Sequence, residues 1–131
     1  MYFDDFSFND NIDFFAGKSI MLNTDGYIYG NMFKDEFVPY KNYGVYKLKG
    51  SDEKETLKLK IMEETFIIND LNLYLDINPN ESDLFEELKK HIKFLNEYKK
   101  EYESKYEALC VTGIKDSFSW IDNPWPWEGE K

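Results

Sequence analysis

Helical periodicity runs through two consecutive segments between Asp52 and Tyr106, and it limits the fold more than any other feature. Turning successive residues by about 100° sorts the apolar side chains of the first segment onto two opposite sides of a helix. The first stripe consists of Leu57, Ile61, Ile68, Leu71 and Leu75, and the second stripe consists of Leu59, Met62, Phe66, Leu73 and Ile77. A helix with two apolar sides needs cover on both, and a single partner helix covers one.

Helix-capping residues in the sequence predict where each of the two helices begins. Asp52 and Glu55 have capping-box spacing, so the first helix is expected to begin at Asp52. Asn78 followed by Pro79 is a start signal for the second helix, although Asn80 or Ser82 could cap a later start. The second segment carries a seam with alternating steps of four and three, formed by Leu84, Leu88, His91, Leu95, Tyr98 and Tyr102. The short reversal between the segments predicts an antiparallel hairpin with a solvated mixed-charge outer face.

The first 49 residues are rich in Phe and Tyr without a regular period. A short helix is expected from Asn11 to Lys18, with turns at Asp25-Gly26 and at Gly30-Asn31. Such an aromatic segment is unlike a disordered one, so we interpret it as an irregular arm that lies on the hairpin. In the alternative, its aromatic side chains face another protein, and the candidates for that contact include Phe37, Tyr40 and Tyr43.

The last region ends in Trp120-Ile-Asp-Asn-Pro-Trp-Pro-Trp-Glu. Two prolines flank Trp125 and favour an extended backbone. Two interpretations are open: the tail folds back onto the second stripe, or Trp120, Trp125 and Trp127 bind a partner, since Trp is favoured at the centres of interfaces.

Composition excludes several classes of function. The 131 residues suit a single domain, and the net charge of −10, with no Arg, argues against binding to nucleic acid or to an anionic membrane. The chain contains no apolar run long enough for a membrane span, and its single cysteine excludes an internal disulfide. Its first residues, Met1-Tyr-Phe-Asp-Asp, are too acidic for a signal peptide to be expected. We expect a protein made in the cytosol.

No catalytic, cofactor or metal site is predicted. The single His91, even with Glu87 at helical spacing, cannot enclose a pair of metal ions, so we interpret it as a core or boundary histidine. Cys110 is interpreted as a small buried or semi-buried residue. Asp70 borders the second stripe, and we hypothesise that it binds a backbone or Lys group of an arm, with Asn69 and Asn72 satisfying similar groups; the alternative is a solvated Asp70.

Two motifs resemble a known family. Asp70-Leu-Asn-Leu-Tyr-Leu-Asp76 followed by Asn78-Pro79, and the Trp120–Glu128 ending, resemble the CotJB family of bacterial spore coat proteins. Upstream, residues 30–33 and 37–43 weakly resemble the short companion protein CotJA. The resemblance implies a structural or assembly role in the spore coat, next to a manganese-catalase-like protein that the family is thought to help place.

We therefore predict a mainly α-helical single domain over residues 1–131. Residues 1–50 form the CotJA-like aromatic arm, and residues 51–131 form the CotJB-like hairpin with its Trp/Pro tail. The expected function is a non-enzymatic adaptor that is made in the mother cell and then joins the spore coat, where it binds a manganese-catalase-like protein or further copies of itself. The alternative is a tetratricopeptide-like hairpin that binds a cytosolic peptide.

Overall fold

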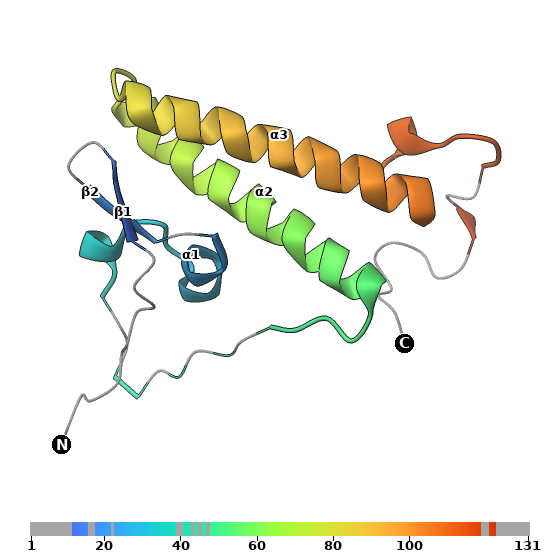
Figure 1. Ribbon diagram of the computed structural model, residues 1–131, viewed down its shortest axis with the longest axis horizontal. Helices are drawn as coiled ribbons and strands as arrows, with labels where there is room; N and C mark the ends of the chain where they lie inside the picture. Colours follow the sequence, from blue (N-terminus) through green and yellow to red (C-terminus); the bar gives the residue numbers. More distant parts are fainter. Residues whose placement is uncertain are drawn as a thin grey trace.

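The computed structural model describes residues 12–15, 18–21, 23–38, 41, 42, 44, 46, 48–118, 121 and 122. Two long helices dominate these residues, α2 (Glu53–Ile77) and α3 (Ser82–Lys105). They pack along their lengths and run in opposite directions (Figure 1). The prediction of a mainly helical protein built on an antiparallel hairpin is confirmed. Among the described residues, no helix combines the length and the apolar character needed to cross a bilayer.

The start of α2 follows the predicted capping pattern with one change. The Asp52 side chain accepts a hydrogen bond from the Glu55 backbone N–H at 2.8 Å. The Glu55 carboxylate in turn accepts from the backbone N–H of Ser51 at 2.7 Å, one residue before the cap. Both hydrogen bonds satisfy backbone donors at the helix start, so the predicted boundary is confirmed.

The predicted start of the second helix at Asn78 is wrong, because Asn78 ends α2 instead. Its backbone N–H and its side-chain amide donate to the Tyr74 carbonyl, at 3.0 and 3.1 Å. The next residues make the reversal, in which the N–H of Glu81 donates to the carbonyl of Asn78 and the N–H of Ser82 to that of Asn80. The helix α3 therefore begins later, at Ser82, with Glu81 as its N-cap residue.

The N-terminal arm is more regular than predicted. Strand β1 (Ile12–Phe15) pairs antiparallel with β2 (Lys18–Met21), with Ile12 opposite Met21 and Phe15 opposite Lys18. The expected helix over Asn11 to Lys18 is thus wrong, since the β-branched and aromatic residues there favour a strand once it has a partner. A short 3-10 helix, η1 (Lys34–Glu36), ends this part of the arm.

The turn expected at Asp25-Gly26 is also wrong, because both residues lie in helix α1 (Asn23–Tyr29). Gly26 is needed there for close packing, since a side chain at this position would collide with the sulfur of Met32. The predicted turn at Gly30-Asn31 is present, and Gly30 adopts a positive φ of 72°, which favours glycine.

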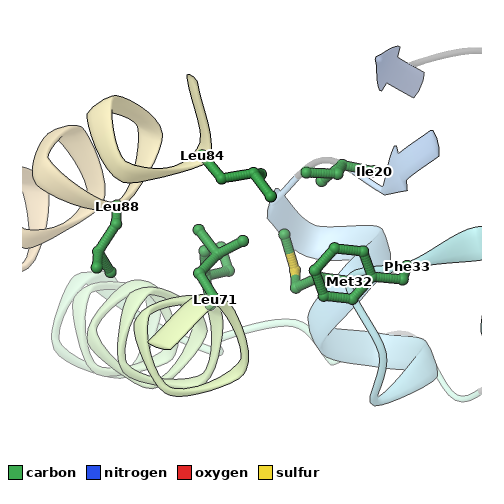
Figure 2. Packing of buried hydrophobic residues seen from close by; sticks show 7 residues of the cluster. Ile20, Met32, Phe33, Leu71, Leu84 and Leu88 are labelled. Atoms are coloured by element: carbon green, nitrogen blue, oxygen red, sulfur yellow. The ribbon is translucent and has the colours of Figure 1, made fainter. Parts of the chain in front are cut away.

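The arm packs on the half of the hairpin near its reversal. A cluster of buried residues, here called the tip cluster, joins the arm to both helices, as the labelled side chains in Figure 2 show. Its members are Ile20, Met32, Phe33, Ile67, Leu71, Leu84 and Leu88. The prediction that the arm lies on the hairpin is confirmed for these residues.

A second cluster, here called the base cluster, lies at the other end of the hairpin. It contains Leu57, Ile61 and Tyr102, with Leu95, Tyr98, Tyr106 and Leu109 packed against it. The segment after α3 continues through the 3-10 helix η2 (Val111–Gly113) and is held by Glu103, whose carboxylate accepts from the Leu109 N–H at 3.1 Å. The hairpin therefore has two apolar clusters, with the arm on one and the segment after α3 on the other.

Candidate functional site

The second stripe of α2 is covered at one point by the described part of the arm. The ring of Tyr27 meets Phe66 edge-on, with centroids 5.9 Å apart at an angle of 62°. Further along the stripe, Leu73 is 57% exposed and Ile77 is 80% exposed. These two residues, with the exposed Met62, form what we call the open stripe. The part of the chain that the structure describes leaves this apolar surface accessible.

The arm misses the open stripe because it approaches α2 from one side, between the two stripes. The rings of Phe33 and Tyr74 stack there, with centroids 4.7 Å apart and an angle of 28°. Ile67, on the same side of α2, is fully buried in the tip cluster. By rotation around the helix, Leu73 and Ile77 lie beyond this contact.

Asp70 ties the arm to α2. Its carboxylate Oδ2 accepts a hydrogen bond from the backbone N–H of Met32 at 2.8 Å, in a partly buried place. The carbonyl of Met32 accepts from the N–H of Met21 at 2.7 Å, so β2, Met32 and α2 form one continuous hydrogen-bonded connection. The hypothesised partner of Asp70, a backbone group of the arm, is present in the structure; the effect on stability stays a prediction.

Asn69 and Asn72, unlike Asp70, do not lie on the side of α2 that the described part of the arm contacts. Both are exposed residues of α2. By rotation they share a polar side of α2 with Thr65 and Asp76, and this side faces away from Tyr74 and the arm. Their expected role in satisfying backbone groups stays a prediction.

A buried polar pair links the two helices. The Nδ1 of His91 lies 2.6 Å from Oε2 of Glu64, and the two residues are 4% and 6% exposed. On the other side of the ring, Nε2 lies 3.5 Å from Oε1 of Glu87. Buried polar groups are costly unless they are hydrogen-bonded, and this pair meets that condition. The interpretation of His91 as a core residue agrees with this position.

Sequence reasoning missed Glu64, although a signal for it exists. In the first stripe the step from Ile61 to Ile68 is seven residues, whereas the neighbouring steps alternate between four and three. Glu64 fills the empty position of that pattern. Apart from two tyrosines, His91 is the only polar residue in the seam of α3. A buried histidine needs a hydrogen-bond partner, and the facing helix is the place where that partner is expected.

Of the aromatic candidates for partner binding, the described residues include Phe37. Its ring meets Tyr29 edge-on, with centroids 5.4 Å apart and an angle of 64°, and the residue is half-buried. The other candidates, Tyr40, Tyr43, Trp120, Trp125 and Trp127, lie outside the described residues. Their role in binding stays a prediction.

Cys110 is exposed, so its interpretation as a buried or semi-buried residue is wrong. The segment after Tyr106 leaves the helix and carries the thiol to the surface. There the hydrogen bond with the Thr112 hydroxyl, at 2.9 Å, lowers the pKa of the Cys110 thiol, and backbone N–H groups of Thr112 and Gly113 act in the same direction.

The described residues contain no group of three or more His, Cys, Asp and Glu placed to hold a metal ion. A shallow groove of about 230 Å³ lies at the start of α2, where Leu48, Gly50 and Lys58 meet Leu59 and Met62. Its walls combine apolar side chains of the second stripe with exposed charges. This arrangement suits contact with another macromolecule.

Comparison with known proteins gives one family. The family model described as CotJB protein matches residues 54–128, which include both long helices and the Trp/Pro tail. No curated protein and no solved structure matches the chain.

Proposed function

Because this chain belongs to the CotJB family, it is a spore coat-related protein, and we propose that it is a non-enzymatic adaptor that binds a manganese-catalase-like coat protein. The hairpin provides a rigid support, and its open stripe provides the contact surface. The observation that carries the proposal is the exposure of Leu73 and Ile77 on a helix whose other apolar side is buried.

The contact surface has the chemistry of a docking site. A soluble domain can leave single apolar side chains exposed, but Leu73 and Ile77 are one helical turn apart and share a side with Met62. Burying each of them against a partner would contribute on the order of 1.5–3 kcal/mol before the costs of association. Their location on a well-packed helix means that little backbone ordering is needed on binding.

The arm contributes by fixing the hairpin. Its tip cluster and the Asp70 hydrogen bond hold the half of α2 that carries Leu73 and Ile77. The surface is therefore presented in one conformation. The aromatic residues outside the described part, in particular Trp125 and Trp127, extend the proposed contact.

The proposal is tested by measuring binding to the manganese-catalase-like protein encoded nearest to this chain. The double variant Leu73→Ser/Ile77→Ser is expected to bind at least about 10-fold more weakly than wild type, because a loss of roughly 1.4 kcal/mol corresponds to a factor of ten. Both side chains are exposed, so the variant should unfold at a similar urea concentration to wild type.

The matched control is Val111→Ser/Phe118→Ser. It removes two apolar side chains of similar exposure, 60% each, that lie after α3 rather than on the open stripe. This control should bind like wild type. Equal binding by wild type, the open-stripe variant and the control would show that the open stripe is not part of the interface. If wild type does not bind, the adaptor function itself is contradicted.

A further inference from the structure

The outer face of α3 separates positive from negative charge. The helix contains six lysines and six carboxylates, so it is neutral within a chain of net charge −10. Rotation by about 100° per residue places them on two flanks. The basic flank consists of Phe85, Lys89, Ile92, Lys93, Asn96, Lys99, Lys100 and Glu103, and the acidic flank consists of Asp83, Glu86, Glu87, Lys90, Phe94, Glu97, Glu101 and Lys105.

The basic flank has four lysines and one carboxylate, Glu103, which lies in the last turn of α3 and accepts from the Leu109 N–H. Its apolar residues are accessible, with Phe85 50% and Ile92 41% exposed, and the Lys89 ammonium lies 5.0 Å from the centre of the Phe85 ring. An open groove of about 390 Å³ runs over this flank, and Glu97 from the neighbouring flank lies at its edge. This surface combines apolar contacts with positive charge.

The acidic flank has the opposite character. It carries five carboxylates and the exposed ring of Phe94, against two lysines: Lys90 pairs with Glu87 at 2.8 Å, and Lys105 pairs with Glu101 at 2.9 Å. Two ion pairs cross the boundary between the flanks, Lys89 with Glu86 at 2.6 Å and Lys93 with Glu97 at 3.9 Å. All four of these side chains are at least half exposed, so they remain accessible to a second partner.

We propose that the basic flank of one copy of this chain binds the acidic flank of a second copy, so that α3 helices lie side by side. Each flank offers charges and an exposed apolar residue that the other flank complements. The contact joins two different surfaces, so each bound copy still presents one unused flank, and the association repeats along a row. This inference is independent of the adaptor function, which uses the open stripe of α2.

Electrostatics favours a second copy as the occupant, because both complementary surfaces are present on this one helix. The net charge of −10 opposes association at long range. At physiological ionic strength this repulsion is screened beyond about 8 Å, whereas the lysine–carboxylate pairs act at contact distance. Association is therefore expected to be strongest at intermediate salt.

The experiment uses two charge-reversed variants of the full chain, Lys93→Glu/Lys100→Glu on the basic flank and Glu97→Lys/Glu101→Lys on the acidic flank. Their masses are measured by light scattering over a range of protein concentrations, alone and mixed in equal amounts. Circular dichroism checks that both variants keep the helical content of wild type. Lys41→Glu/Lys49→Glu, which makes the same change in charge at two exposed lysines outside α3, is the matched control.

Wild type and the Lys41→Glu/Lys49→Glu control are expected to increase in mass with concentration, while each charge-reversed variant alone stays a monomer. The mixture is expected to associate again, because it restores one basic and one acidic surface. A monomeric wild type, or a mixture that stays monomeric, would overturn the proposal. If wild type is monomeric and the basic-flank variant loses affinity for the catalase-like protein, the basic flank belongs to that partner and self-association is likewise rejected.

Discussion

The Glu64–His91 pair shows how a single polar contact can fix the alignment of two helices. Along α2 it follows Ile61 of the base cluster, and along α3 it follows Leu88 of the tip cluster. A hydrogen bond between these positions, 2.6 Å long, is satisfied in one register of the hairpin. Sliding one helix by a turn would leave both groups buried and unpaired, which is costly.

The Glu64→Leu variant is expected to lose about 1–3 kcal/mol of stability, because it leaves His91 buried without its closest partner. The double variant Glu64→Leu/His91→Leu should recover most of this loss, since removing both partners of a buried pair is often nearly neutral. Urea unfolding of the two single variants and the double variant measures the coupling. Strictly additive changes would show that the pair does not act as a unit.

Glu64 also shows what residue patterns can and cannot reveal. The buried seam of α3, including His91, follows from its steps of four and three. A carboxylate among charged neighbours is usually exposed, so the local pattern around Glu64 predicts a solvated residue. Its burial is indicated only by the gap in the first stripe together with the polar His91 on the facing helix. The exposure of Cys110 could not be predicted, since it depends on how the chain leaves α3.

At the scale of elements, the connection between the arm and α2 is made by Asp70. One carboxylate oxygen accepts from Met32, whose carbonyl continues the bonding to β2. The side chains of Met32 and Phe33 then fill the tip cluster next to the two helices. The Asp70 carboxylate therefore fixes the backbone of Met32 against α2, beside the packed side chains of the tip cluster.

The Asp70→Ala variant should lower the free energy of unfolding by about 1.5–3 kcal/mol, the range for a hydrogen bond to a charged group. Asp70→Asn should cost less, because its amide oxygen can still accept from Met32. The exposed Asp76 on the same helix is the control, and Asp76→Ala is expected to change stability by less than about 0.5 kcal/mol. Chemical denaturation measures all three variants, and an Asp70→Ala variant as stable as Asp76→Ala would exclude an anchoring role.

Sequence patterns predict the elements to different degrees. The hairpin and the cap at Asp52 follow from local rules that hold in isolation. The sequence predicts a helix where β1 lies and does not predict β2, because a four-residue strand is stabilised by its partner and by the buried Ile20 and Met21, which lie outside the local pattern. Asn78 was assigned to the wrong helix because Asn is suited to both helix ends.

At the scale of the whole molecule, the described residues of the arm, the hairpin and the segment after α3 bury one side of α2 and leave part of the other side accessible. The hairpin and its family membership could be predicted, because the motifs that carry the resemblance lie within the matched residues 54–128. The extent to which the second stripe is covered could not be predicted from the sequence, since it depends on the direction from which the arm approaches α2.

The most direct test of the adaptor function is the mass of the complex in solution. Wild-type protein and the catalase-like protein encoded nearest to it are analysed by light scattering on a sizing column, separately and mixed. We predict a new peak that contains both proteins and whose mass exceeds that of the catalase-like protein alone. Two separate peaks with unchanged masses at every mixing ratio would contradict the proposed function.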